Sequence, residues 1–190
     1  MRVDIDWLVD RYGLFEQRVR TWMERWCRPY CSACPHVCCR AHFCIETRQS
    51  AFLASVAGRF SPRSDFSHLR GWIGQGGCTL VAGRPPVCYE FVCRPIIDDV
   101  AGDFLRHHAL LVATMVMTHV GKRVIGGRHL VEATQTKDLN RIKAEPFLAR
   151  LDAAEAAFDL ATDLLEGRPL HENNDLLIRI VPPPRKNKKT

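Results

Sequence analysis

The chain has 190 residues, of which 46% are hydrophobic and 25% charged, and this composition excludes disorder over most of its length. A chain of this length can bury a core without metal ions or disulfides, so its nine cysteines require a chemical explanation. The formal net charge is +6, but the last six residues carry four of these charges, on Arg185, Lys186, Lys188 and Lys189. The remaining +2 excludes a strongly basic body, and we therefore do not expect nucleic acid as a partner.

The N-terminal segment predicts one long amphipathic helix. Apolar residues recur there at spacings of three and four, from Ile5 to Trp26, which places them on one stripe of a helix over residues 5–27. We expect this helix to end before Pro29. Residues 1–12 lack the basic start and the uninterrupted apolar run of a signal peptide, so the expected location is cytoplasmic.

Further helices are predicted after the cysteine-rich segment. Residues 45–60 are predicted to form a short helix, whereas residues 61–95 are rich in glycine and proline, which indicates turns. Asp98 and Asp99 are expected to open a helix that runs to His119, and a last helix is indicated over residues 151–165. Residues 171–181 are expected to be extended. The most apolar stretch, residues 109–117, is shorter than the ~20 residues that cross a bilayer, so no membrane partner is expected.

These patterns predict a mainly α protein in which helices flank an irregular, cysteine-rich metal-binding core. We expect a single domain over residues 1–181. It comprises the N-terminal helix 5–27, the cysteine-rich core 27–95 and a C-terminal helical part 98–167. Residues 182–190 are expected to form a disordered basic tail.

The nine cysteines fall into two groups. The first group contains Cys27, Cys31, Cys34, Cys38, Cys39 and Cys44, and the second contains Cys78, Cys88 and Cys93. A disulfide framework is disfavoured because the count is odd and the expected compartment is reducing. A thioredoxin-like redox pair at Cys31 and Cys34 would need a helix that begins there after a strand, whereas the preceding segment is predicted to be helical.

Metal ligation explains the spacing of the cysteines best. A CxxC turn lets two thiolates converge on one ion, and further cysteines complete a sulfur shell. The adjacent Cys38 and Cys39 favour a multinuclear site, because neighbouring side chains diverge and more easily serve two metal centres. Arginines near both groups suit negatively charged thiolates, although a solvated surface position explains each of them equally well. These arginines are Arg28, Arg40, Arg84 and Arg94.

The order of these residues resembles a known family. The segment Cys31-x2-Cys34-x3-Cys38-Cys39, followed by Gly77-Cys78-Thr79-Leu80 and by Arg84-Pro85-x2-Cys88-x4-Cys93, resembles the YkgJ-type cysteine-cluster proteins, which are described as zinc- or iron-chelating. The resemblance covers roughly residues 31–93. The chain departs from the family pattern in two ways. It has three residues before the double cysteine where the family commonly has two, and it has no cysteine in residues 66–77.

The resemblance implies metal binding, through zinc or an iron–sulfur cluster. A related cysteine cluster belongs to the flagellin lysine N-methylases, where it accompanies methyl transfer from S-adenosylmethionine. The sequence offers no glycine-rich loop between a strand and a helix that would bind a nucleotide-like cofactor. The glycines from Gly74 to Gly77 precede a cysteine, and they are predicted to form a turn.

We predict eight metal ligands, and all of them are cysteines: Cys31, Cys34, Cys38, Cys39, Cys44, Cys78, Cys88 and Cys93. The family motif assigns neither Cys44 nor Cys27; we add Cys44 as an eighth ligand, and Cys27 is the alternative source of this thiolate. His36 and His42 are weaker alternatives to a thiolate, and Glu46 and Glu90 are expected to be solvated. The two cysteine groups should meet in space, so metal binding would close the segment between them and contribute to folding. Zinc and an iron–sulfur cluster are both candidates, since thiolates suit both.

The expected function is that of a metal-binding protein with an accessory or structural role. The first alternative is an iron–sulfur-dependent enzyme related to the flagellin lysine N-methylases. The second is a zinc module that binds nucleic acid through the basic tail. The sequence identifies no catalytic residue and no protein partner.

Overall fold

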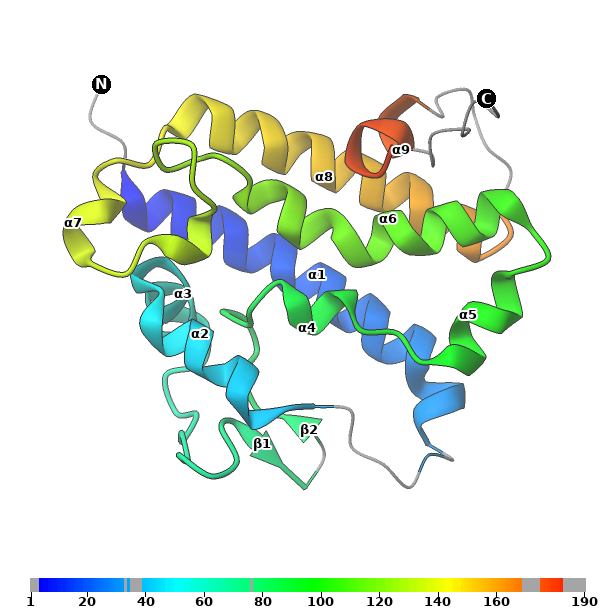
Figure 1. Cartoon of the computed structure of the whole chain (residues 1–190), viewed down its shortest axis with the longest axis horizontal. Helices are drawn as coiled ribbons and strands as arrows, with labels where there is room; N and C mark the ends of the chain where they lie inside the picture. Colours follow the sequence, from blue (N-terminus) through cyan, green and yellow to red (C-terminus); the bar gives the residue numbers. More distant parts are fainter. Residues whose placement is uncertain (1–3, 33, 35–38, 76, 169–174, 183–190) are drawn as a thin grey trace, which may run out of the picture.

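The computed structural model describes residues 4–32, 34, 39–75, 77–168 and 175–182. As predicted, the chain is mainly helical (Figure 1). Its helices are α1 (Ile5–Cys31), α2 (Cys44–Gln49), α3 (Ala51–Phe60), α4 (Val87–Glu90), α5 (Arg94–Val100), α6 (Phe104–Gly121), α7 (Thr136–Leu139), α8 (Ala144–Leu165) and α9 (Asp175–Ile180), with the 3-10 turns η1 (Ala41–Phe43) and η2 (Leu130–Glu132). Strands β1 (Ile73–Gly74) and β2 (Gly77–Cys78) form a small antiparallel pair. No helix within these ranges is long and apolar enough to cross a membrane.

The main core lies between the three long helices. Helix α6 packs along α8, and α1 lies beside them. In the view of Figure 1, α6 and α8 lie above α1, whereas α2, α3 and the two strands lie below it. Buried alanines such as Ala113 and Ala154 allow α6 and α8 to approach closely. Aromatic side chains fill the space towards α1, where Phe15 packs edge-on against Phe158 at a centroid distance of 5.9 Å.

Helix α1 is longer than the sequence predicted. It begins after Asp4, whose side chain caps it, and it continues through Pro29 to Cys31. The predicted end at residue 27 was wrong, because Pro29 lacks one backbone donor but the helix continues past it for two more residues. The last turn is still closed, since the Ser32 N–H bonds to the Arg28 carbonyl at 3.0 Å. The first cysteine group therefore begins on a helix.

Two predicted helices are each divided by a capping side chain. The helix expected from Asp98 to His119 is two helices, α5 and α6, because the Asp103 carboxylate accepts hydrogen bonds from the first N–H groups of α6. The helix expected over residues 45–60 is also two helices. Ser50 divides it into α2 and α3, and its hydroxyl accepts a hydrogen bond from Leu53 N–H at 3.3 Å. Side-chain acceptors thus set boundaries that hydrophobic spacing alone did not reveal.

The C-terminal part is more helical than expected. The last long helix begins at Ala144 rather than at residue 151, and Pro146 lies in its first turn, where the missing N–H has no helical partner to lose. Residues expected to be extended include α9, whose Leu177 and Ile180 are buried. The amphipathic spacing of these residues favours a helix once α6 and α8 offer an apolar surface. Of the predicted tail, residues 183–190 lie outside the described residues.

Ion pairs join α1 to α8 at intervals of seven residues. The pairs are Arg11 with Asp152 at 3.1 Å, Arg18 with Asp159, and Arg25 with Glu166. Each pair lies seven residues later than the one before it in both helices, so α1 and α8 run in the same direction. This ladder covers the apolar contact between the two helices on one side.

Candidate metal centre

Two of the predicted ligands share a small apolar cluster that is separate from the main core. Cys44 opens α2 and is buried in this cluster with Trp72 and Leu80, and Cys78, at the end of β2, packs against it. Gly71 leaves room for the thiol, because an added Cβ there would lie 2.4 Å from the Cys44 Sγ. One cysteine of each group thus lies in the same place, although residues 45–77 separate them in the chain.

Cys88 brings a further thiol into electrostatic reach of this cluster. The residue lies in α4 and keeps exposed surface, but the pKa of its thiol is raised to about 12, first by desolvation and next by the charge of Cys78. The Arg84 guanidinium opposes this shift, whereas Cys44 and Cys39 add to it. Charges interact in this way only over short distances. Thiols from both cysteine groups therefore lie near one another.

The remaining predicted ligands are placed differently. Cys93 precedes α5 and, like Cys27, packs against the main core. Cys31 ends α1, Cys34 follows it, and both are exposed. Cys38 lies outside the described residues. Within the described ranges, no group of three or more His, Cys, Asp or Glu side chains is placed to hold a metal ion. Of the described thiols, those of Cys44 and Cys78 share one cluster, whereas Cys27 and Cys93 pack against the main core.

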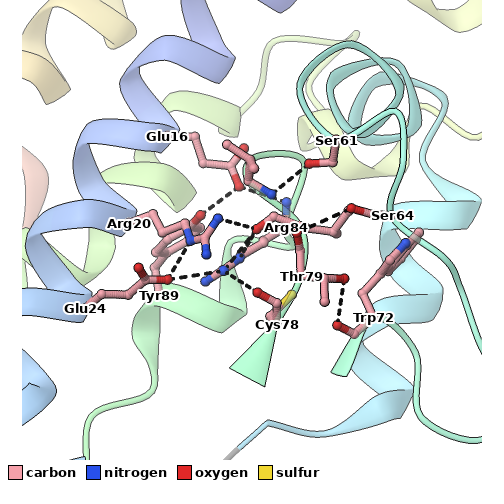
Figure 2. A network of polar contacts seen from close by, with 12 residues as sticks. Glu16, Arg20, Glu24, Ser61, Ser64, Trp72, Cys78, Thr79, Arg84 and Tyr89 are labelled. Carbon is pink, nitrogen blue, oxygen red and sulfur yellow. Dashed lines mark hydrogen bonds and ion pairs between the residues drawn. The ribbon is translucent and has the colours of Figure 1, made fainter. Parts of the chain in front are cut away.

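Arginine side chains hold the segment that carries Cys78. Figure 2 shows the Arg84 guanidinium, which donates to the carbonyl oxygens of Cys78 (3.2 Å) and Leu80 (3.0 Å). Arg20 of α1 also donates to the Leu80 carbonyl, at 2.8 Å. Arg84 therefore has two effects. It fixes the backbone beside one predicted ligand, and its charge favours the thiolate form of another, Cys88.

A buried carboxylate on α1 anchors the same segment. One oxygen of Glu16 accepts a hydrogen bond from Gly83 N–H (2.7 Å). The other accepts from Arg84 N–H (2.8 Å) and from the Tyr89 hydroxyl (2.7 Å), and Figure 2 shows Glu16 beside Arg84 and Tyr89. Burial raises the pKa of Glu16 to about 7, and these hydrogen bonds oppose the shift. Our sequence analysis missed Glu16. Its position four residues after Tyr12, on the apolar stripe of α1, was the available signal, because a carboxylate there needs partners.

Gly83 is the point at which three helices meet this segment. Its N–H bonds to Glu16 of α1, and its carbonyl accepts a hydrogen bond from the Thr47 hydroxyl of α2 at 2.8 Å. A Cβ added to Gly83 would lie 2.6 Å from the backbone nitrogen of Ala57 in α3. Its φ of +90° also lies in the left-handed region that favours glycine. A larger residue therefore fits here only if one of these helices moves.

Hydrogen bonds to the segment after α3 fix the backbone of Thr79 and Val81, which follow Cys78. The Ser61 hydroxyl accepts a hydrogen bond from Val81 N–H at 2.7 Å. Thr79 is held twice, because its N–H donates to the Trp72 carbonyl at 2.8 Å and its carbonyl accepts from the Ser64 hydroxyl at 3.3 Å (Figure 2). The backbone from Cys78 to Val81 is therefore held by side chains or by neighbouring backbone.

Two glutamates near the cysteines are half-buried rather than solvated. Glu46 and Glu90 each follow a predicted ligand by two residues. The pKa of Glu46 is raised, mainly by burial and next by the charge of Glu90. Glu90 also accepts a hydrogen bond from the Thr118 hydroxyl of α6. The expectation of solvated carboxylates was wrong, because α4 packs against α6 and partly encloses its glutamate.

The other residues that the sequence singled out lie on the surface or outside the described ranges. His42, Arg28 and Arg40 are exposed. Arg94 is exposed as well, and it pairs with Asp98 at 2.7 Å. His36 lies outside the described residues. Among the four arginines expected near the thiols, Arg84 acts through its charge on Cys88.

Comparisons of the chain with protein-family models, with curated proteins and with solved structures found no match. The resemblance to the YkgJ-type proteins therefore remains an expectation from the cysteine motif.

Proposed function

We propose that this protein binds zinc or an iron–sulfur cluster through cysteine thiolates of both groups. One observation carries the proposal: Cys44 of the first group and Cys78 of the second group pack in the same small apolar cluster, although they are distant in the chain. Metal ligation also explains why a chain that can fold without metal ions or disulfides contains nine cysteines. The donors suit the proposed metals, since thiolates are the ligands that zinc and iron–sulfur clusters prefer.

The residues proposed as ligands differ in their support. Cys44 and Cys78 are supported by the cluster that they share, and Cys88 is supported by the charges of Cys78, Cys44 and Cys39 that raise the pKa of its thiol. The remaining four, Cys31, Cys34, Cys38 and Cys93, rest on the spacing of the motif. A bound zinc ion would supply a cross-link between the two groups, and a cluster would supply a redox centre. In either case the thiols must lose their protons, which Arg84 favours at Cys88.

The proposed role is accessory or structural, and the proposed location is the cytoplasm. Reduced thiols are maintained in reducing compartments, which suits metal ligation by cysteines. The described residues do not favour the methyl-transfer alternative or the nucleic-acid alternative over this role, so we do not extend the proposal to them.

The direct test is the metal and acid-labile sulfide content of protein purified without oxygen and without added metal. We expect bound zinc, or iron with matching sulfide. The variants Cys78→Ser and Cys88→Ser should each lower the metal content, whereas Cys27→Ser, a cysteine outside the proposed ligand set, should leave it unchanged. Protein that contains neither metal, even after reconstitution, would contradict the proposal.

A further inference from the structure

We propose that Glu16 is the positioning residue of the metal centre: it holds the segment from Cys78 to Cys88 against α2, which carries Cys44, so that these thiols are gathered before a metal binds. This inference rests on the proposed function. It assigns to α1, on which the motif places a ligand at the last residue, Cys31, a further part in metal binding.

The carboxylate of Glu16 bonds to three residues of the segment that carries Cys78 and Cys88. The two oxygens of Glu16 accept three hydrogen bonds, from the N–H groups of Gly83 and Arg84 and from the Tyr89 hydroxyl. Gly83 lies midway between Cys78 and Cys88, and Tyr89 directly follows Cys88. Glu16 therefore fixes the centre of the segment between two predicted ligands and also one of its ends.

A hydrogen bond at Gly83 links this segment to the first cysteine group. The Gly83 carbonyl, on the same residue that Glu16 holds, accepts a hydrogen bond from the Thr47 hydroxyl at 2.8 Å. Thr47 is fully buried and lies three residues after Cys44, about one turn along α2. The connection from Glu16 through Gly83 to Thr47 thus joins both cysteine groups without any metal.

The stability of the fold explains poorly why a carboxylate is buried at this position of α1. Burial of a charge is unfavourable, and an apolar residue on this stripe of α1 would serve the core better. The three hydrogen bonds of Glu16 specify instead the path of one segment, and that segment carries the thiols. Ligands that are held in place bind a metal with less loss of conformational freedom, so we expect the affinity for metal to depend on Glu16.

The test compares four proteins that are stripped of metal and titrated with Co²⁺ without oxygen: the wild type, Glu16→Gln, Thr47→Val and Asp138→Asn. In Glu16→Gln, the amide NH2 would face the N–H group of Gly83 or Arg84, and two donors cannot form a hydrogen bond. Thr47→Val removes the hydroxyl that donates to the Gly83 carbonyl. Asp138 is a matched control, because it is another buried carboxylate and accepts a hydrogen bond from Gln135 N–H in α7. The readouts are the affinity, from competition with a chelator, and the absorption bands of the thiolate-bound Co²⁺.

We expect Glu16→Gln and Thr47→Val to lower the affinity by roughly 10- to 100-fold and to shift the cobalt bands, as loss of an outer-shell contact does. Asp138→Asn should retain wild-type values. Far-UV circular dichroism follows folding, and if Glu16→Gln does not fold, Thr47→Val decides by the same readouts. A lower affinity in the folded variants supports the inference even where the saturated bands are unchanged, because the cost of ordering the thiols appears in the affinity. Unchanged affinity together with unchanged bands would overturn it, because Glu16 would then only stabilise the fold. A wild type that binds no metal would instead contradict the proposed function.

Discussion

Glu16 is enclosed on α1 by apolar neighbours, and three donors face its carboxylate. The balance between them leaves its pKa at about 7, above the ordinary value of 4.5, with burial as the largest cause. A carboxyl group with a raised pKa is protonated in the folded state over a range of pH in which it is ionised in the unfolded chain. Its contribution to stability is therefore fully present below about pH 4.5 and is lost as the pH rises through about 7.

We predict that the wild type gains stability relative to Glu16→Gln as the pH falls from 8 to 5, with a slope of up to about 1.4 kcal/mol per pH unit. The comparison between the two proteins is needed because His119 acts in the opposite direction. Burial first, and then the charges of Lys122 and Arg150, lower its pKa to about 4. Urea unfolding at several pH values gives the measurement, and parallel curves for the two proteins would contradict the prediction.

Gly83 gives a second prediction for a single residue. We expect Gly83→Ala to destabilise the fold by about 2 kcal/mol more than Gly127→Ala. Both residues have a φ near +90°, so alanine is strained at both positions, but only at Gly83 would the new Cβ meet backbone, that of Ala57 at 2.6 Å. No atom lies within 4 Å of a Cβ added at Gly127. Chemical denaturation of both variants measures the difference, and equal losses of stability would show that the helix can move aside.

Helices α1 and α8 show how an element-scale contact combines exposed charges with a buried stripe. The ion pairs of the ladder lie at the surface, where water and salt weaken them. The aromatic contact between Phe15 and Phe158 beneath them is buried. Burial removes apolar surface from water, so the stripe should contribute most of the stability of this contact.

We therefore predict that Arg18→Ala lowers the free energy of unfolding by less than about 1 kcal/mol, whereas Phe15→Ala lowers it by about 3 to 5 kcal/mol. Thermal and urea unfolding of the two variants, at low and high salt, provide the measurement. A double-mutant cycle with Asp159→Ala isolates the ion pair, and it should show a coupling that disappears in salt. A large, salt-independent loss in Arg18→Ala would mean that the ladder directs the packing of the helices.

Helix boundaries could be predicted only in part, because they depend on single capping bonds and on contacts with other helices. Spacings of three and four predicted α1 and the later helices correctly, because one stripe of a helix must face a core. The divisions at Ser50 and Asp103 depend on single capping bonds, and such residues occur equally often in loops. Helix α9 forms where α6 and α8 offer an apolar surface, which its own short segment does not reveal.

At the scale of the molecule, the main core and the cysteine segments are separate. Cys44 belongs to the small cluster with Trp72 and Leu80, whereas the main core is formed by the long helices. Hydrogen bonds from Glu16, Thr47 and other side chains already hold the segment between the cysteine groups. The expectation that a bound metal would also close this segment and contribute to folding stays a prediction.

We predict that removal of metal by a chelator leaves most of the helical circular dichroism signal in place. The change should be local, because a bound metal would restrain the segments around Cys44 and Cys78 rather than the long helices. Limited proteolysis should then accelerate mainly within residues 61–80, and bound zinc should reverse the effect. Loss of most of the helical signal on chelation would show that the main core also depends on the metal.

The sequence by itself determined the helical class of this protein and the division of its cysteines into two groups. Both follow from local features, since periodic spacing and residue type can be read along the chain. Only the tertiary structure decided that Cys44 and Cys78 share one apolar cluster and that Glu16 holds Gly83 and Tyr89. These contacts join residues far apart in the chain, so they arise only after the helices pack, and no local pattern of charge or hydrophobicity specifies which partner a buried carboxylate will meet.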